Sequence, residues 1–210
     1  SYGKMGAAVL ASQACLRSGV GLLHTHVPRL GYTILQTVVP EAMVSIDPEE
    51  EHFSRLPELS AYSAIGIGPG IGFAPQTRNS LKLLIQNTPV PLLFDADAIT
   101  ILGENRTWLS FVPKNSIYTP HPKEFERISE KARNDHHRIE LQRGFCVKHG
   151  VYVVLKGAHT SICGPDGTCW FNSTGNPGMA TGPSGNFCVL MSLRFTEETE
   201  SEDSANETPA

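Results

Sequence analysis

The amino-acid sequence predicts an α/β fold built on a mostly parallel sheet. Short apolar segments such as 64–68, 91–95 and 151–155 alternate with longer helix-like segments. This alternation indicates βαβ units, whose strands run parallel and are covered on both faces. Glycine, proline and polar residues directly follow these segments, and in such sheets ligands bind beyond the carboxyl ends of the strands. We therefore expect a single ligand crevice along one edge of the sheet.

The remaining elements follow from local patterns. Segment 4–18 has a face of small apolar residues, and Gly19 is placed to end the helix. Segment 49–59 is polar and is expected at the surface. Segments 160–163 and 168–172 predict a hairpin over a Pro-Asp-Gly turn. In full, the expected helices are 4–18, 31–39, 76–86 and 124–149, and the expected strands are 21–27, 42–46, 64–68, 91–95, 117–120, 151–155, 160–163 and 168–172.

Length and charge limit the class of protein. A chain of 210 residues has room for one ordinary domain, and no apolar run approaches the roughly 20 residues of a membrane span. Residues 196–210 contain six acidic groups and no Lys or Arg, so 195–210 is expected to be a disordered acidic tail. The remaining 17 basic and 15 acidic residues give the body a charge of +2, which does not favour nucleic-acid binding.

Five cysteines and the absence of a Cys-x-x-Cys pair favour reduced thiols in a cytoplasmic protein. Cys163 and Cys169 flank the turn of the expected hairpin. We expect them to face each other across its strands and not to bind a metal.

A glycine-rich segment at 175–186 reads GNPGMATGPSGN and precedes the apolar run 187–193. A glycine-rich loop that opens a helix directs free backbone N–H groups at one point, where the helix dipole also favours negative charge. The segment therefore predicts a phosphate-binding loop. A plain surface turn is the alternative.

Seven stretches in order resemble the ADP-dependent NAD(P)H-hydrate dehydratase family of the ribokinase-like superfamily. They are ACLRSGVGLLHTHVP (14–28), VVPEAMV (38–44), AIGIGPGIG (64–72), LLFDADAI (92–99), YTPHPKEFERI (118–128), VVLKGAHT (153–160) and GNPGMATG (175–182). The resemblance implies a ribokinase-like three-layer sandwich. It also implies a lyase that converts NADHX or NADPHX to NADH or NADPH, with ADP or ATP as phosphoryl donor and Mg²⁺ on the phosphates. It further implies a functional partner, NAD(P)H-hydrate epimerase, and we expect a homo-oligomer without membrane or nucleic-acid contacts.

The resemblance also implies roles for individual residues. Substrate contacts fall on Ala7, Gly70, His121 and Asn186, nucleotide contacts fall on Lys156, Gly157, Ala158, His159, Thr160 and Gly185, and the catalytic position is Asn186. Residue types alone leave alternatives open: Ala7 as a small helix residue, Gly70 as a turn glycine, His121 as a structural histidine and Lys156 as a solvated strand-end charge. No metal ligand is assigned, although Asp95 and Asp97 are candidates.

Two departures from the family pattern affect the activity expected. The family loop ends in Gly-Ser-Gly-Asp or Gly-Thr-Gly-Asp, whereas residues 182–186 read Gly-Pro-Ser-Gly-Asn. Asn186 cannot accept a proton, and loss of a general base costs about 10²- to 10⁴-fold in rate. Family elements before Lys4 and after residue 194 also have no counterpart here, so the domain over 1–194 is expected to be truncated at both ends.

Three alternatives remain at this stage. A small-molecule kinase of the same superfamily would share the anion-binding loop and form a stable phosphorylated product. A catalytically silent nucleotide-binding remnant would bind ADP without turnover. A chain that does not fold alone would lack a cooperative thermal transition.

Overall fold

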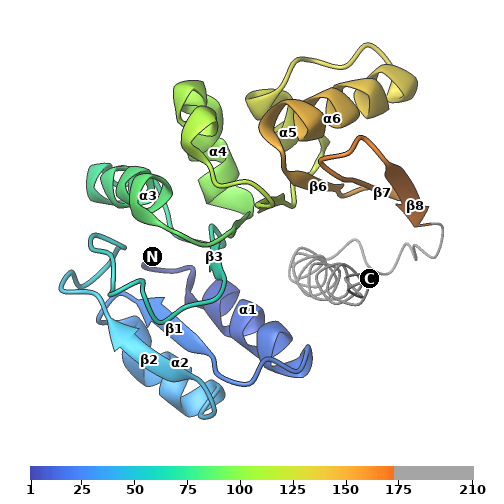
Figure 1. Ribbon diagram of the computed structural model, residues 1–210. Helices are drawn as coiled ribbons and strands as arrows, with labels where there is room; N and C mark the ends of the chain where they lie inside the picture. Colours follow the sequence, from blue (N-terminus) through green and yellow to red (C-terminus); the bar gives the residue numbers. More distant parts are fainter. Residues whose placement is uncertain (173–210) are drawn as a thin grey trace, which may run out of the picture.

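The computed structural model describes residues 1–172, which form two β-sheets flanked by helices (Figure 1). The elements in chain order are α1 (Met5–Arg17), β1 (His24–Val27), α2 (Gly31–Val38), β2 (Met43–Ile46), β3 (Ile65–Ile67), α3 (Pro75–Asn87), β4 (Leu92–Phe94), α4 (Ala96–Glu104), the 3₁₀ helix η1 (Arg106–Phe111), β5 (Ile117–Tyr118), α5 (Pro122–Ile128), α6 (Asp135–His149), β6 (Tyr152–Leu155), β7 (Thr160–Cys163) and β8 (Cys169–Asn172).

The larger sheet confirms the mostly parallel α/β fold. Its strand order is β3-β4-β5-β6-β7-β8. The first four strands pair in parallel, and β7 and β8 add an antiparallel hairpin at one edge. Because β3 to β6 run parallel to one another, their carboxyl ends lie together at one edge of the sheet.

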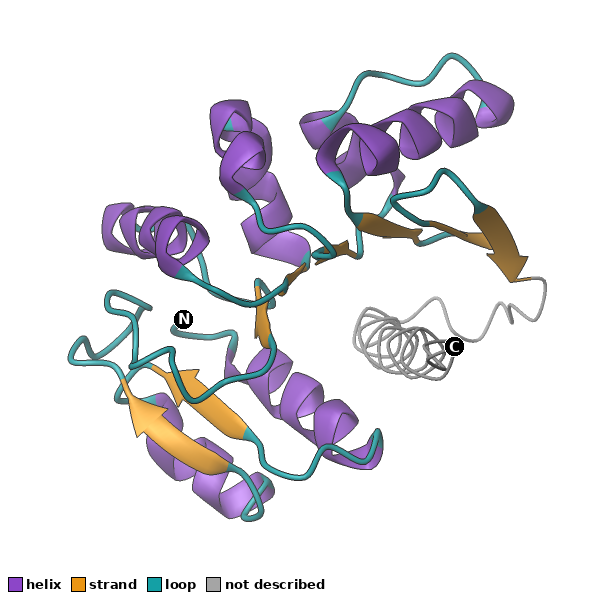
Figure 2. Cartoon of the chain, in the orientation of Figure 1, coloured by secondary structure: helices purple, strands orange, loops and turns teal. Residues whose placement is uncertain are grey.

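β4 is buried along its whole length, and successive side chains enter cores on opposite faces of the sheet. Leu92 and Phe94 belong to the main core, together with buried side chains of α3, α4, α5 and α6. Leu93, between them, belongs instead to a smaller cluster with Ile117 and Val154. Figure 2 shows α3 to α6 along one side of this sheet. The main core is thus the layer between these helices and the sheet, which holds the strand ends in register.

The first two strands form a separate unit. β1 and β2 pair in parallel, and α2 connects them. Leu35 of α2 is fully buried in a second core with Met5 of α1 and Val27 of β1. Among the described strands, β1 and β2 pair only with each other, so the segment 47–64 carries the chain from this unit to the larger sheet.

The polar-surface prediction for 49–59 is wrong for its apolar residues. Phe53, Leu56 and Leu59 pack against the main core. The buried carboxylate of Asp47 accepts hydrogen bonds from the backbone N–H groups of Glu49, Ser54 and Arg55 and from the Ser54 hydroxyl. These bonds hold the segment in a compact irregular form, which composition alone does not reveal.

The single helix predicted over 124–149 is two helices. α5 ends at Ile128, and α6 begins at Asp135. Asn134 is the N-cap of α6, and its side-chain oxygen accepts a hydrogen bond from the backbone N–H of His137 at 2.8 Å. The N-cap preference of Asn is the local signal for this boundary.

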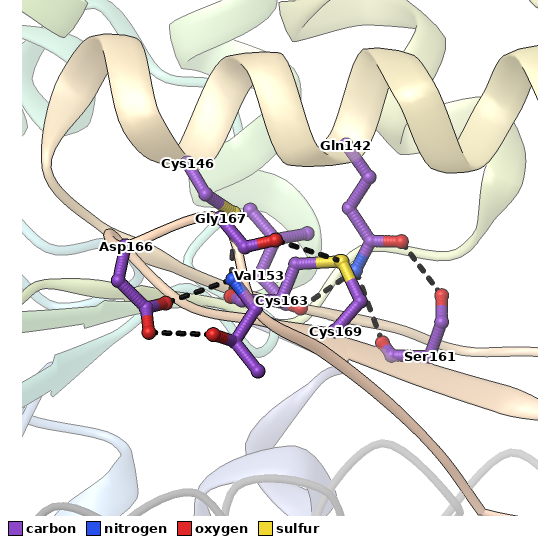
Figure 3. Close-up of a disulfide and its surroundings, with 9 residues drawn as sticks. Gln142, Cys146, Val153, Ser161, Cys163, Asp166, Gly167 and Cys169 are labelled. Carbon is purple, nitrogen blue, oxygen red and sulfur yellow. Dashed lines mark hydrogen bonds between the residues drawn. A yellow bond between two sulfur atoms is a disulfide. The ribbon is translucent and has the colours of Figure 1, made fainter.

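The hairpin of β7 and β8 was predicted correctly, and its cysteines do face each other. Cys163 and Cys169 are register partners and form a disulfide (Figure 3), so the expectation of reduced thiols is wrong for this pair. Gln142 of α6 is fully buried and donates to the carbonyl oxygens of Val153 and Ser161, while the Ser161 hydroxyl donates to its Oε1. Gln142 therefore joins the helix to both β6 and β7.

The position of Asp47 predicts a pH-dependent stability. Burial alone would raise the pKa of Asp47, but hydrogen bonds from Ser54, Glu49 and Arg55 lower it from 3.8 to about 2. A depressed folded pKa contributes stability above the unfolded value, and this contribution is lost as the pH falls from about 4 to about 2. We expect Asp47→Asn to lower the free energy of unfolding at pH 7 by about 3 kcal/mol and to weaken its decline below pH 4.

Urea unfolding at pH 7, 4 and 2.5 measures both effects. Glu50→Gln is the matched control, because this exposed carboxylate lies in the same segment and its removal should change stability by less than about 0.5 kcal/mol. Equal losses in the two variants would contradict the role of Asp47.

Candidate functional site

Backbone hydrogen bonds bring four motif-bearing strand ends together. The residue that directly follows each of β4, β5 and β6 donates its backbone N–H to the neighbouring strand or to the segment just after that strand. The bonds are Asp95 N–H to Ile67 O (3.1 Å), Thr119 N–H to Phe94 O (3.0 Å) and Lys156 N–H to Pro120 O (2.9 Å). This confirms that the turns after β3, β4, β5 and β6 form one edge. The fifth expected contributor, 175–186, lies outside the described residues.

At this edge, the backbone of Gly68 packs very closely against the backbone of Asp95. The φ of Gly68 is +139°, and a Cβ at this position would lie 1.8 Å from the carbonyl oxygen of Asp95. Only glycine can adopt this conformation against the neighbouring chain. Ala96, directly after Asp95, has a positive φ of 47°, which is uncommon for a residue with a side chain. The turn after β4 therefore combines close packing with local backbone strain.

The Asp95 side chain joins the ends of β5 and β6. Its Oδ1 accepts a hydrogen bond from the Thr119 hydroxyl at 2.9 Å and another from the Lys156 ammonium at 2.8 Å. The Asp95 side chain is only 6% exposed, and that of Lys156 is 20% exposed. The ammonium is thus held at the edge of the site by a nearly buried carboxylate.

Asp97, two residues later, holds a second lysine. Its Oδ2 accepts from the Lys4 ammonium at 3.1 Å and from the Gly72 backbone N–H at 2.9 Å. Lys4 directly precedes α1, whereas Gly72 ends the glycine-rich turn after β3. Asp97 therefore ties the start of α1 to that turn.

Two predicted substrate residues meet in one cavity. Ala7 and Gly70 line a hollow of about 350 Å³ together with Gly3, Lys4, Gly6 and Asp97. Gly70 has a φ of +67°, and a Cβ there would lie 3.2 Å from the Ala7 Cβ and 3.0 Å from the Lys4 carbonyl oxygen. A side chain at position 70 would fill the space where the two segments meet, so glycine keeps the cavity open.

His121 lies at the end of β5 but is not among the lining residues of this cavity. It is the N-cap of α5: its Nδ1 accepts the Glu124 backbone N–H at 3.2 Å, and its own N–H donates to the Glu124 carboxylate at 2.9 Å. This reciprocal arrangement is a capping box. The side chain is still about half exposed, so it can contact a ligand as well as cap the helix.

The predicted nucleotide stretch begins at Lys156 and continues through three exposed residues to Thr160 in β7. A Cβ at Gly157 would meet no atom closer than 3.6 Å, so the fold does not itself require glycine there. A partly exposed ammonium beside an open backbone is a suitable surface for phosphate oxygens. These residues therefore fit the phosphates of a nucleotide. Gly185 and Asn186, the other two predicted contacts, lie outside the described residues.

The candidate magnesium ligands have other partners. The carboxylates of Asp95 and Asp97 each accept a lysine ammonium, and residues 1–172 contain no cluster of three or more His, Cys, Asp or Glu side chains that could hold a metal ion. Mg²⁺ bound to substrate phosphates needs only one or two carboxylates. The described residues therefore supply no complete metal site of their own.

Sequence reasoning missed the two lysine–aspartate pairs. Lys156 was assigned to the nucleotide and Asp95 to a possible metal, without a link between them. Parallel strand order was the available signal, because residues that follow adjacent strands lie at the same edge. The pairing of Lys4 with Asp97 had no such signal, since Lys4 precedes a helix.

Comparison with known proteins identifies relatives with the same motifs. The family model for NAD(P)H-hydrate dehydratase matches residues 1–190. The bifunctional NAD(P)H-hydrate repair enzyme Nnr of Moorella thermoacetica is 35% identical over 195 residues, which are 88% of this chain and 37% of that enzyme. The ADP-dependent (S)-NAD(P)H-hydrate dehydratase of Bacillus subtilis is 34% identical over 195 residues, which are 90% of this chain and 66% of that enzyme.

Solved structures agree with this assignment of fold. The ADP/ATP-dependent NAD(P)H-hydrate dehydratase of Bacillus subtilis, co-crystallised with ATP/Mg²⁺ and soaked with CoA, has a TM-score of 0.72 and 30% identity over 91% of this chain and 69% of its own. A ribokinase-like superfamily protein of Enterococcus faecalis has a TM-score of 0.69 and 27% identity over 89% and 64%. The fold is ribokinase-like, and the chain spans just over a third of the bifunctional relative and about two thirds of the shorter one.

The packing of Gly68 on Asp95 predicts a sharp contrast between two glycines of one segment. Gly68→Ala should destabilise the protein by about 3 kcal/mol or more, because the new Cβ overlaps backbone that cannot move aside. Gly66→Ala, two residues earlier, meets nothing within 4 Å and should be tolerated. Chemical denaturation of the two variants measures the difference, and a stable Gly68→Ala protein would contradict the packing described.

Proposed function

We propose, from the premise that this chain belongs to the NAD(P)H-hydrate dehydratase family, that it converts NADHX or NADPHX to NADH or NADPH with cleavage of ADP or ATP. The observation that carries this proposal is the meeting of the family motifs at one edge of the sheet. Ala7 and Gly70 line a single cavity, and Lys156 lies beyond the next strands of the same edge. The proposed substrate cavity and the proposed phosphate-binding lysine therefore lie along the same edge, with the ends of β4 and β5 between them.

The proposed cofactors fit the chemistry of the reaction. ADP or ATP would transfer its terminal phosphoryl group to the ring hydroxyl, which gives up its proton. Phosphate, a better leaving group than hydroxide, would then depart as a neighbouring ring carbon loses a proton and the double bond forms. Mg²⁺ would neutralise charge on the phosphates. The Bacillus subtilis matches support this choice: the sequence relative is named ADP-dependent, and the solved structure was co-crystallised with ATP/Mg²⁺.

The chain's own residues supply binding and orientation. The ammonium of Lys156 offers donors to phosphate oxygens, and the open backbone at 157–160 accommodates the nucleotide. Ala7 and Gly70, which have no bulky side chains, leave room for the hydrated ring in this cavity. The half-exposed ring of His121 contacts the substrate from the start of α5, while its Nδ1 remains bonded to the helix backbone and its Nε2 lies 3.3 Å from the Glu124 carboxylate.

Asn186 occupies the position where the family pattern has an aspartate. We propose that this residue lowers the rate without preventing binding, because its amide has the shape of the carboxylate but cannot accept the hydroxyl proton. Gly185 would contribute backbone contacts to the nucleotide. We further propose a domain over 1–194 with an acidic tail at 195–210.

The wider setting of the activity is also proposed. An epimerase that interconverts the two forms of the hydrated coenzyme is the functional partner, in agreement with relatives named as bifunctional repair enzymes. We propose a homo-oligomer in the cytoplasm, where nicotinamide coenzymes are used. None of the helices within residues 1–172 has the length and hydropathy of a membrane span.

The test compares this chain with its Asn186→Asp variant. NADH formation from NADHX is followed by absorbance in the presence of ADP and Mg²⁺, and ADP binding is measured in parallel. We expect both proteins to bind ADP and the variant to be about 10²- to 10⁴-fold faster, because it restores a general base.

Each other result excludes part of the proposal. Equal rates would mean that another group accepts the proton. ADP binding without turnover in either protein would identify a silent nucleotide-binding remnant. A stable phosphorylated product would identify a kinase, and failure of both proteins to bind ADP would exclude the proposed function.

Substitution of His121 separates its capping role from its proposed substrate role. Asparagine is among the best N-cap residues, so His121→Asn should retain the stability of α5, whereas His121→Ala should lose about 1 kcal/mol. Both variants should raise the KM for NADHX in the Asn186→Asp background. Thermal unfolding and steady-state kinetics measure the two roles, and an unchanged KM in the Asn variant would leave His121 as a cap only.

A further inference from the structure

Asp95 occupies an N-cap position without acting as a cap. It directly precedes α4, where aspartate commonly accepts a backbone N–H of the first turn, but its side chain makes no capping hydrogen bond. Its Oδ1 instead accepts from Thr119 and Lys156, at the ends of the next two strands. The usual local partner of an N-cap carboxylate is given up for two distant ones.

The surrounding backbone fixes the direction of this carboxylate. Gly68 packs against the Asp95 backbone so closely that no Cβ fits, and Ala96 adopts a positive φ immediately afterwards. Strained and closely packed backbone of this kind concentrates at functional sites. The Thr119 hydroxyl, which is fully buried, then fixes one face of Oδ1. The carboxylate is therefore rigid before any ligand binds.

Lys156, which the rigid Asp95 carboxylate holds, has a flexible side chain. A lysine side chain has four rotatable bonds, and ordering it on a ligand has a large entropic cost. The Lys156 ammonium has three donors, one of which is directed at Asp95. Its side chain remains 20% exposed, so the ammonium is not sealed in the interior. Asp95 thus orders the lysine and leaves donors for a second partner.

We propose that Asp95 is a positioning residue that holds the Lys156 ammonium in place for the phosphates of the nucleotide. The inference rests on the proposed function for the assignment of the nucleotide to 156–160. Asp95 does not touch the nucleotide and acts only through Lys156. It improves affinity because the ordering of the lysine is completed in the free protein.

A double-mutant cycle on ADP binding tests this role. The full chain, Asp95→Asn, Lys156→Met and the double variant are titrated with ADP and Mg²⁺ by calorimetry. Lys156→Met should weaken binding about 10- to 100-fold, and Asp95→Asn about tenfold. The double variant should bind like Lys156→Met alone, because Asp95 has no effect once the lysine is absent.

Adenosine provides a readout that a purely structural role would not move. It lacks the phosphates that Lys156 would contact, so Asp95→Asn should bind adenosine as the natural chain does. Glu104→Gln is the matched charge control, since Glu104 ends the same helix and pairs with Arg78 away from this edge. This variant should bind both ligands like the natural chain. Thermal unfolding of every variant confirms that the folded protein is compared.

The possible results separate this inference from the proposed function. If the natural chain does not bind ADP, both are overturned. If the natural chain binds ADP and Asp95→Asn binds it equally tightly, only the positioning role is overturned. Tighter binding by Asp95→Asn would mean that the carboxylate competes with phosphate for Lys156, and it overturns the same role. A weakening that persists in the Lys156→Met background, or that extends equally to adenosine, overturns it as well.

Asp95→Glu keeps the inference testable if the asparagine variant does not fold. It retains the charge but moves the carboxylate by one methylene, so ADP binding should weaken while adenosine binding is preserved. Unchanged ADP affinity in a folded Asp95→Glu protein would contradict a role that depends on position.

Discussion

The contact on which this edge of the sheet depends is the meeting of Gly68, Asp95 and Lys156. Gly68 allows the end of β3 to pack on the backbone after β4, and the Asp95 carboxylate then reaches the ends of β5 and β6. Four strands of two to four residues each have few ladder hydrogen bonds of their own. The bonds at their carboxyl ends therefore contribute to the register of the sheet as well as to the site.

Stability alone gives a weak reason for an aspartate–lysine pair at such a position. Removing two charges from water is costly, and apolar residues of similar size often serve a fold equally well. Asp47 is a useful contrast, because its buried carboxylate accepts three backbone N–H groups and a hydroxyl, and its other side-chain contact is the His26 ring at 3.2 Å, with no lysine or arginine among these partners. Asp47 organises a loop, whereas Asp95 holds a cation that remains partly open to solvent.

The sequence was sufficient where a pattern is local and insufficient where a partner is distant. Alternating apolar segments and terminal glycines predicted most of the elements in their order, although α4 and η1 were missed, and the Pro-Asp-Gly turn predicted the hairpin. The break before α6 was missed although Asn134 signals it. The burial of Phe53 could not be predicted from composition, because it depends on Asp47 organising the loop around it. The prediction that Ala7 and Gly70 contact the same substrate rested on the family resemblance. The pairing of Asp95 with Lys156 follows only from the order of the strands.

Asp95, the N-cap of α4, and Asp97, in the first turn of that helix, have a consequence for the proposed reaction. Asp95 holds Lys156 of the proposed nucleotide stretch, and Asp97 holds Lys4, which lines the cavity of Ala7 and Gly70. Phosphoryl transfer requires donor and acceptor within a few ångströms, so the two binding regions must keep a fixed separation. The start of α4 is bonded to both regions and is itself held by the packing of Gly68 on the Asp95 backbone, so it links the two regions more rigidly than two independent loops could. Ala96, which lies between these two aspartates, has the positive φ of 47°, and strained backbone of this kind persists only where the surrounding structure holds it in place.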